Sequence, residues 1–481
     1  MLAIEKLSIA SGSSLADAMH LIDKEAPAVC FVIDGKRLIG IVTDGDIRRS
    51  LLAGKTVDCV VDLVMKRDFF SLPPNSSIET IQKHILKHKY IPIVNEAGEL
   101  VDFATPSQYH QIPLIQPVFD GNELEYVTEC IRTGWISSQG KYVRLFEERF
   151  SEYVGCPNAL AVSNGTVAIH LALVTLGIGP GDEVIVPDLT FAAPVNAVLY
   201  VGATPVLVDV DPITMAIDHN AAAAAVTDRT RAIIPVHLYG HPANMTKLML
   251  LAEQNDLLVI EDCAEALGSR YCETHVGNFG HASTFSFFGN KTITTGEGGM
   301  VLFRDAVMRD RARILRDHGM APDRRYWHNE VGFNYRLTNI QAAIGLAQME
   351  KIDTFVERKR WIANQYKARL TGLDALLLPA ECGNSYNSYW LYTVVLTAEY
   401  VMKRNEVLEL LTSRGIEARP VFFPIHRMPP YERFNPHGST WPVSDHLSDA
   451  GISLPSSITA TEDDIQRVCT ALISILAGES K

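Results

Sequence analysis

The stretch Ser286–Met300, SFFGNKTITTGEGGM, places Lys291 in an apolar and glycine-rich setting that a solvated surface lysine does not need. Residues 283–288 have the pattern of a short buried strand, and the glycines of TTGEGG permit a tight turn before a second strand at 300–303. A lysine partly removed from water gives up its charge more readily, and its amine can then form a Schiff base. The competing interpretation is a lysine that reaches from the strand end to solvent.

The composition indicates a globular chain of two or three domains, with 481 residues, 47% hydrophobic and 21% charged. The net charge of -13 argues against nucleic-acid binding as a main role. Without a long apolar run or the apolar core of a signal peptide, we expect no membrane span and a cytoplasmic protein. The eight cysteines contain no CxxC pair, so neither a metal site nor a disulfide framework is predicted.

Residues 1–110 repeat one plan, in which an amphipathic helix precedes two short strands. The expected helices are 13–25 and 76–88, and the expected strands are 28–33, 37–42, 90–94 and 100–104. At the end of the first repeat stands GIVTDGDIRR, Gly40–Arg49. With this stretch and the repeated plan, the segment resembles a tandem CBS-domain regulatory module.

In CBS domains the positions of Thr43 and Asp46 contact the phosphate side and the ribose hydroxyls of an adenine nucleotide, so the resemblance implies one such site. The second repeat has Thr105 at the first position but Gln108 at the second, which argues against a second site. The alternative is that the aspartates of TDGD cap the following helix.

Residues 106–117, PSQYHQIPLIQP, are typical of a linker with a boundary near Ile112. From Pro180 onward strand and helix signals alternate, which predicts a mostly parallel sheet covered by helices. The expected strands are 183–187, 204–210, 230–236, 257–262, 283–288 and 300–304, with a helix at 243–255. A capping box of Thr338 and Gln341 predicts the start of a long helical stretch that runs to about Leu370. Strands at 390–396 and 416–422 around a helix at 404–414 predict a smaller α/β domain.

Four features of this region can form one site. Gly165 and Thr166 lie before an apolar helix at 167–176, where backbone amides and the helix dipole attract a phosphate. Asp262 ends an apolar strand, where a carboxylate needs a cationic partner such as a protonated pyridine nitrogen, unless it caps a helix at 264–267. Phe191 can stack on a flat ring, and the hydroxyl of Ser286 can reach the same phosphate.

A phosphate cradle, a stacking ring, a strand-end carboxylate and a Schiff-base lysine are the parts that a pyridoxal 5′-phosphate (PLP) enzyme needs. Residues from about Pro113 to the end resemble the fold-type I sugar aminotransferases of the DegT/DnrJ/EryC1/StrS family. The stretches that carry this resemblance are TGWISS (133–138), HLYGHP (237–242), EDCAEALG (261–268), the opening stretch, YWHN (326–329), GFNYRLTN (332–339) and RPVFFPIH (419–426). The resemblance implies a large PLP domain at 113–370 and a small α/β domain at 371–481, preceded by the CBS pair at 1–110.

By position, the resemblance implies that Lys291 holds PLP covalently and moves protons at the reacting carbon. Asp262 would pair with the pyridinium nitrogen, Glu265 would contact the 3-hydroxyl, and Phe191 would stack on the ring. The phosphate would be bound by Gly165, Thr166 and Ser286, together with Asn334 of a neighbouring subunit. We therefore expect a homodimer or a dimer of dimers.

The family implies a ping-pong reaction in which L-glutamate aminates PLP and the cofactor then aminates the C4 ketone of a nucleotide-linked 4-keto-6-deoxy sugar. Within the family, the chain most resembles a subgroup whose acceptor is GDP-4-keto-6-deoxy-D-mannose and whose product is GDP-perosamine. An acidic chain needs local cations for such an anionic substrate. The candidates in the matching stretches are His241, His328, Arg336, Arg419 and His426.

Two alternatives stay open. The acceptor can be a UDP-linked 4-keto sugar, or the CBS pair can make the chain mainly a nucleotide sensor that gates the C-terminal part. A deoxysugar dehydratase of the same fold is disfavoured, because those relatives carry histidine where this chain has Lys291.

Overall fold

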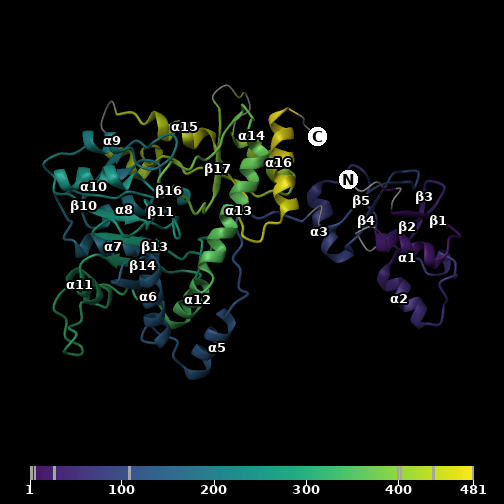
Figure 1. Cartoon of the computed structure of the whole chain (residues 1–481), viewed down its shortest axis with the longest axis horizontal. Coiled ribbons are helices and arrows are strands. Elements are labelled where there is room, and N and C mark those ends of the chain that lie inside the picture. The colour runs from purple at the N-terminus through teal and green to yellow at the C-terminus, as the bar shows by residue number, and fades with distance from the viewer. Residues whose placement is uncertain are drawn as a thin grey trace. The chain divides into compact units, whose positions relative to one another are not determined.

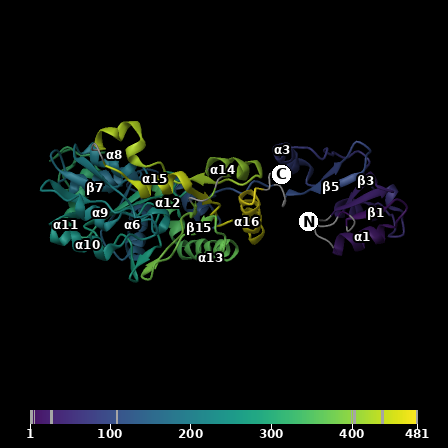
Figure 2. The same cartoon turned by 90° about the horizontal axis from the view of Figure 1, so that it is seen from above.

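The described part of the chain forms two compact units. The computed structural model describes residues 4, 7–24, 29–106, 110–397, 400, 404–435 and 439–478. The first unit comprises Met1–Ile112 with Thr412–Ile416, and the second comprises Pro113–Leu411 with Glu417–Lys481. Figures 1 and 2 show the chain in two views, coloured from one end of the sequence to the other. Gln108, at which the second CBS repeat departs from the first, lies outside the described residues.

The first unit contains the two expected repeats. Its elements are β1 (Ser8–Ala10), α1 (Leu15–Lys24), β2 (Val29–Asp34), β3 (Arg37–Thr43), α2 (Asp44–Leu52), η2 (Val61–Leu63), α3 (Ile78–His88), β4 (Ile91–Val94) and β5 (Leu100–Ala104). β2 and β3 form one antiparallel hairpin, and β4 and β5 form the other. The sequence pattern missed β1, whose three residues pair in parallel with β2 and leave too short a signal for alternation.

A seven-stranded sheet organises the second unit, in the order β6-β14-β13-β10-β9-β7-β8. Its strands are β6 (Ala159–Val162), β7 (Glu183–Pro187), β8 (Thr204–Val208), β9 (Thr230–Ile233), β10 (Leu258–Asp262), β13 (Ala282–Ser286) and β14 (Gly299–Phe303). β14 runs antiparallel to both neighbours and the other pairs are parallel, so the predicted mostly parallel sheet is confirmed. The carboxyl ends of β7, β10 and β13 therefore meet at one edge, where ligands bind in sheets of this kind.

Helices supply the crossovers that parallel strands require. They are α5 (Glu123–Thr133), α6 (Lys141–Val154), α7 (Gly165–Thr175), α8 (Ala193–Tyr200), α9 (His219–Ala224), α10 (Met245–Gln254) and α11 (Ala306–Arg316). α7 is apolar on nearly all sides because it is buried in the main core, next to β13 and β14. None of the helices in the described residues combines the length and apolar character needed to cross a bilayer.

The long helical stretch expected after Thr338 consists of two helices, α12 (Asn339–Met349) and α13 (Ile352–Leu370). The predicted capping box of Thr338 and Gln341 is confirmed at the start of α12. The stretch ends at Leu370 as expected but is interrupted at Lys351, which leaves the helical conformation and whose amine pairs with Glu123 at 2.9 Å. This contact to a distant helix has no signature in the local sequence.

The C-terminal part adds a four-stranded sheet in the order β15-β17-β19-β18. Its elements are β15 (Leu376–Leu377), β17 (Tyr392–Leu396), β18 (Arg419–Pro420), β19 (Gly451–Leu454), α14 (Arg404–Ser413), α15 (Pro442–Ala450) and α16 (Glu462–Leu476). The strand expected at 416–422 is shorter, because the N–H of Phe422 donates to the Tyr239 hydroxyl at 3.2 Å instead of continuing the sheet. The domain boundary at residue 371 stays a prediction.

The remaining short elements lie around the large sheet. β11 (Arg270–Tyr271), β12 (Thr274–His275) and β16 (Ser385–Tyr386) form a small antiparallel sheet. The 3-10 helices are η3 (Leu238–Gly240), η4 (Ile425–Arg427) and η5 (Pro429–Phe434). Within η3, Tyr239 has a φ of 53°, a left-handed conformation that a tyrosine rarely adopts.

One lysine lies inside the protein. Lys359 on α13 is 3% exposed, and its amine donates to the carbonyl oxygens of Trp390 at 3.0 Å and Ser456 at 3.1 Å. No ion pair of this lysine occurs among the residues that the structure describes. Burial lowers the pKa of Lys359 from 10.5 to about 7, because the charged form loses its hydration.

This burial predicts a pH-dependent stability. Between pH 7 and 10.5 the unfolded chain binds one more proton than the folded chain, so the free energy of unfolding rises with pH. Lys359→Met removes this contribution. From pH 6 to pH 9, urea unfolding is expected to show the parent gaining about 2–3 kcal/mol relative to the variant. Lys367→Met, at an exposed position of the same helix, is the control and should follow the parent. Identical pH profiles for the parent and Lys359→Met would contradict the prediction.

Candidate active site

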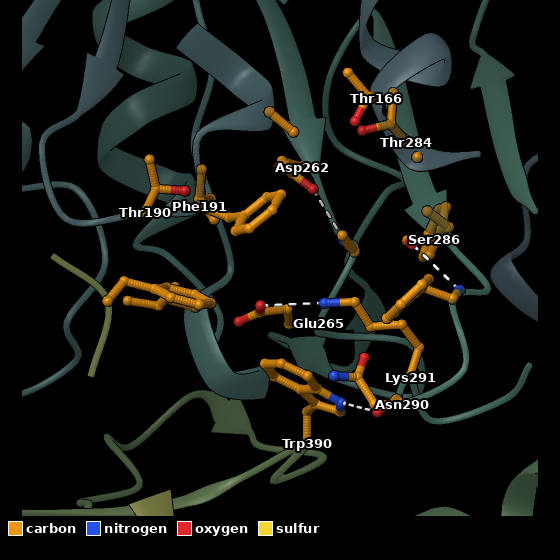
Figure 3. A pocket seen from close by; sticks show the side chains of 18 of the residues that line it. Thr166, Thr190, Phe191, Asp262, Glu265, Thr284, Ser286, Asn290, Lys291 and Trp390 are labelled. Carbon is orange, nitrogen blue, oxygen red and sulfur yellow. Dashed lines mark hydrogen bonds and ion pairs between the residues drawn. The ribbon is translucent and has the colours of Figure 1, made fainter. Parts of the chain in front are cut away.

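A cavity of about 580 Å³ lies at the edge of the large sheet where β7, β10 and β13 end. Apart from Asn334, all the residues predicted to bind the cofactor line this cavity: Gly165, Thr166, Phe191, Asp262, Glu265, Ser286 and Lys291. Figure 3 shows six of their side chains arranged around one space, although they come from different elements: Thr166, Phe191, Asp262, Glu265, Ser286 and Lys291. The tertiary structure thus brings together residues that are up to 126 positions apart, from 165 to 291.

The start of α7 forms a cradle for an anion. Asn164 caps the helix by accepting the N–H of Val167 at 3.0 Å. The N–H groups of Gly165 and Thr166 have no acceptor among the described residues. A Cβ on Gly165 would lie 2.9 Å from the Cβ of Ser286, so glycine is needed for the close approach of the helix to the end of β13. Free amides, a helix dipole and a hydroxyl therefore converge, as phosphate binding requires.

Asp262 ends β10 and points into the cavity from the edge of the sheet. Burial raises the pKa of its carboxyl to about 6, and this outweighs the opposing hydrogen bond from the N–H of Ala264, which is 3.0 Å from Oδ1. The alternative of a helix cap is wrong, because the residues after Asp262 form turns instead of a helix. A buried carboxylate of this kind favours a cationic partner.

Lys291 approaches the same space from the loop after β13. Its side chain is 14% exposed, so it does not extend into solvent as a surface lysine would. The amine donates to Oε1 of Glu265 at 3.2 Å and lies 3.9 Å from the centroid of the Trp390 ring. Glu265 is held in turn by the N–H of Tyr239, which donates to Oε2 at 3.0 Å. Sequence reasoning anticipated the removal from water but missed the contacts that the amine makes with Glu265 and Trp390.

Aromatic side chains line one side of the cavity. Phe191 is 60% exposed, and its ring centroid lies 5.9 Å from that of Phe422. Tyr239 stacks between Phe422 at 5.6 Å and Trp390 at 6.1 Å. Sequence reasoning did not single out Tyr239, Trp390 or Phe422. Their side chains can be assigned to the site only once the chain is folded, although Tyr239 and Phe422 lie inside two of the matching stretches.

Thr190 is a further polar residue of the cavity that sequence reasoning missed. It is 1% exposed, and its hydroxyl is buried without a hydrogen-bond partner in the described part of the chain. An unpaired buried hydroxyl costs free energy unless a ligand satisfies it. Its position next to Phe191, just after the strand expected at 183–187, was the sequence signal that could have indicated a place in the site. Together with the cradle and Asp262, this hydroxyl shows that the cavity's donors and acceptors fit PLP.

Of the residues predicted to bind substrate, Arg419 lines the cavity and pairs with Glu417 at 2.9 Å. His241 is buried outside the cavity, its Nδ1 donates to the carbonyl of Pro242 at 2.8 Å, and burial lowers its pKa. His426 is bound to the carboxylate of Asp188 at 2.7 Å.

His328 and Arg336 also lie away from the cavity. His328 is exposed and contacts the carbonyl of His318 at 2.8 Å. Arg336 pairs with Asp317 at 2.7 Å and lines a second cavity of about 220 Å³. Asn334, the residue expected to act from a neighbouring subunit, is exposed and accepts from Nε of Arg336 at 3.3 Å. The substrate and subunit roles of these residues stay predictions.

In the first unit, Thr43 and Asp46 form a capping box at the start of α2. The Thr43 hydroxyl donates to Asp46 at 2.6 Å, and Lys66 pairs with the same carboxylate at 3.0 Å. Burial alone would raise the pKa of Asp46, but these hydrogen bonds outweigh it and lower the pKa. In this structure both residues therefore cap α2, and adenine-nucleotide binding at Thr43 and Asp46 stays a prediction.

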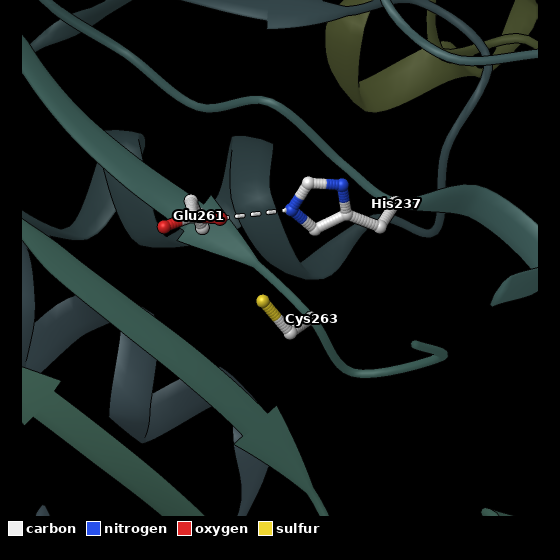
Figure 4. Close-up of side chains that lie close together, drawn as sticks. All are labelled: His237, Glu261 and Cys263. Carbon is white, nitrogen blue, oxygen red and sulfur yellow. Dashed lines mark hydrogen bonds and ion pairs between the residues drawn. The ribbon is translucent and has the colours of Figure 1, made fainter. Parts of the chain in front are cut away.

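A group with the geometry of metal ligands lies at the end of β10: His237, Glu261 and Cys263, all buried (Figure 4). The Glu261 carboxylate accepts from His237 Nε2 at 3.2 Å and from three backbone N–H groups of the loop before β13, at 2.7 to 2.8 Å. His237 Nδ1 accepts the N–H of Ala243 at 3.0 Å. Both carboxylate oxygens and both ring nitrogens are thus already used, so this cluster fixes loops beside Asp262.

The mostly parallel sheet, with a lysine, a strand-end aspartate and an anion cradle at its carboxyl edge, defines the fold-type I class of aminotransferases. The chain belongs to the DegT/DnrJ/EryC1/StrS aminotransferase family, which matches residues 117–473. It also carries two CBS domains, at residues 4–53 and 60–107. Aminotransferases of this family are PLP-dependent.

Similar proteins include GDP-perosamine synthases. That of Escherichia coli O157:H7 is 47% identical over 363 residues, covering 75% of this chain and 97% of the relative. That of Caulobacter vibrioides is 46% identical over 371 residues, covering 77% and 100%. Among solved structures, DesV of S. venezuelae in complex with a ketimine intermediate has a TM-score of 0.71 and 32% identity, covering 76% and 99%. The PLP form of Spr1654 from Streptococcus pneumoniae has a TM-score of 0.74 and 25% identity, covering 77% and 100%.

Proposed function

We propose that the chain transfers the amino group of L-glutamate to the C4 ketone of GDP-4-keto-6-deoxy-D-mannose, forming GDP-perosamine, with PLP bound at Lys291. The observation that carries the proposal is the cavity in which Lys291 meets Glu265 beside Asp262, in a chain 47% identical to a GDP-perosamine synthase. The similarity extends over nearly the whole length of that relative.

The residues of the cavity have separate roles in this reaction. PLP, when bound, supplies an aldehyde that carries the amino group and a ring that accepts electrons. Asp262 offers a buried negative charge to the ring nitrogen, and the amides of Gly165 and Thr166 with the Ser286 hydroxyl offer donors to the phosphate. Lys291 provides the amine for attachment and, once free, a base for the proton of the substrate carbon, with Glu265 in hydrogen-bond reach.

A homodimer is part of the proposal. Asn334 is exposed and lies outside the cavity of its own chain, which suits a side chain that reaches the phosphate of a neighbouring subunit. Several large apolar side chains in two of the matching stretches are also exposed: Trp135, Ile136, Tyr326 and Trp327. Exposed apolar side chains in these numbers favour burial against a second copy.

The test is direct amination of defined sugars. Purified protein with PLP and L-glutamate is incubated with GDP-4-keto-6-deoxy-D-mannose, and in parallel with UDP-linked 4-keto-6-deoxy sugars, and the products are identified by mass. We expect the amino sugar only with the GDP-linked substrate, and none when L-glutamate is omitted. Exclusive conversion of a UDP-linked sugar would overturn the assigned substrate, and no conversion of any sugar would overturn the function.

A further inference from the structure

Trp390 is a buried residue of the cavity whose ring is fixed on two sides. It is 4% exposed, and its indole N–H donates to the carbonyl of Asn290, the residue before Lys291, at 2.7 Å. One face of the ring stacks on Tyr239 with 12° between the planes. A hydrogen bond at the ring edge and a stacking contact at the ring face together restrict its orientation.

The backbone of Trp390 is hydrogen-bonded to a buried lysine. Its carbonyl accepts from the buried amine of Lys359, which also binds the carbonyl of Ser456. Lys359 lies on α13 and Ser456 follows β19, so one amine ties two distant segments to the residue that forms the cavity wall. Burying a lysine is costly, and both of these carbonyls would lack this donor without it.

The amine of Lys291 rests between two groups that attract a positive charge. The Trp390 ring centroid lies 3.9 Å from Nζ, within the range of a cation–π interaction. The Glu265 carboxylate lies 3.2 Å from the same atom. The other ionisable side chains that line the cavity are Tyr200, Tyr239, Asp262, Glu297 and Arg419.

We propose that Trp390, anchored by Lys359, is a positioning residue that seats the charged amine of Lys291 against Glu265. The inference rests on the proposed function, in which Lys291 carries the cofactor. Glu265 and Trp390 would hold the amine whenever it is not bonded to the cofactor. A long flexible side chain loses much freedom when it is ordered, so a defined resting place keeps the amine near the reacting atoms.

The test measures the reactivity of Lys291 in protein stripped of cofactor. Acetic anhydride acylates lysine amines that it can reach, and the acetylated peptide is quantified by mass at pH 8. Trp390→Leu removes the ring that covers one side of Nζ, so labelling of Lys291 is expected to rise about three- to tenfold. Trp390→Phe keeps a weaker ring and should give a smaller rise. Lys359→Met frees the Trp390 carbonyl and should shift labelling in the same direction.

Two controls separate positioning from general damage. Trp361→Leu makes the same change on α13, where the ring lies 3.8 Å from Arg358 and does not line the cavity, so Lys291 labelling should equal the parent's. Exposed Lys247 in the same sample is the internal standard, and circular dichroism reports folding. If Trp390→Leu fails to fold, Trp390→Phe decides the question.

Unchanged labelling of Lys291 relative to Lys247 in a folded Trp390 variant would overturn the inference. A rise of the same size in Trp361→Leu would overturn it as well, because the effect would then not depend on the cavity wall. Failure of the proposed function would appear separately, as parent protein that does not change the absorption spectrum of added PLP, while the labelling result stands.

Discussion

Lys291→Ala is expected to lower turnover with L-glutamate and the GDP-linked keto sugar on the order of a thousandfold or more. In the proposed function, alanine removes both the amine that attaches PLP and the base that moves the substrate proton. None of the other side chains that line the cavity is a lysine, so the amine has no replacement in this part of the chain. Free PLP can still bind in the phosphate cradle of this variant. Any residual turnover would then need an amine from solution in place of the lysine.

The measurement is single-turnover conversion of PLP by glutamate, followed by absorbance, together with product formation by mass. Lys247→Ala, at an exposed position of α10, is the matched control and should retain the parental rate. Reduction with borohydride should fix PLP to the parent at Lys291 and leave the variant unlabelled at this position. A Lys291→Ala variant that turns over keto sugar at the parental rate would refute the proposed function.

Asp262→Asn is expected to lower turnover by about two to three orders of magnitude, because asparagine keeps the shape of the side chain but offers no negative charge to a ring nitrogen. Asparagine can still accept the N–H of Ala264, which preserves the turn after β10. The loss should therefore appear with normal folding. Stopped-flow absorbance of the glutamate half-reaction measures it, and a rate within threefold of the parent would contradict the assigned role.

The same substitution should stabilise the cofactor-free protein. The folded pKa of Asp262 is about 6 and the unfolded reference is 3.8, so the folded chain binds more protons between these values. The contribution of this carboxyl to stability is therefore full below pH 3.8 and is lost as the pH rises through 6. At pH 7, cofactor-free Asp262→Asn should exceed the parent by about 1–3 kcal/mol in free energy of unfolding.

Urea unfolding of both proteins at pH 4 and pH 7 tests this sign. The advantage of Asp262→Asn should grow between the two pH values, whereas exposed Asp323→Asn should follow the parent at both. Saturating PLP should reduce the advantage, because a cation beside the carboxylate offsets its burial. Equal free energies of unfolding for cofactor-free Asp262→Asn and parent at pH 7 would contradict the prediction that the buried Asp262 carboxylate destabilises the folded chain.

Much of the site could be predicted because its residues carry local signals. An apolar strand that ends in Asp262, a small-residue turn before α7 and a lysine among glycines are each visible within about ten residues. Apart from β6, which was not predicted, the strands of the large sheet were predicted within a few residues for the same reason, since alternating or continuous apolar runs reflect burial directly. The family resemblance then implied how these separate signals combine.

Long-range contacts explain what could not be predicted. Lys359 stands in the charged run ERKR, which is typical of a solvated helix face, yet its amine lies in the interior against the backbone of Trp390. The amine of Lys351, at the break between α12 and α13, likewise pairs with Glu123, more than two hundred residues earlier in the chain. Such contacts depend on where α13 packs, and no window of sequence contains that information.

The sequence by itself determined the fold class and placed Asp262 at a strand end and Lys291 in an apolar, glycine-rich stretch, because burial patterns and turn chemistry act between near neighbours. Only the tertiary structure decided which surfaces Lys291 touches, namely Glu265 and Trp390, and that Lys359 supports the latter from within. These contacts join segments about 26 to 100 residues apart, so they arise only when the sheet and the C-terminal segments have packed together.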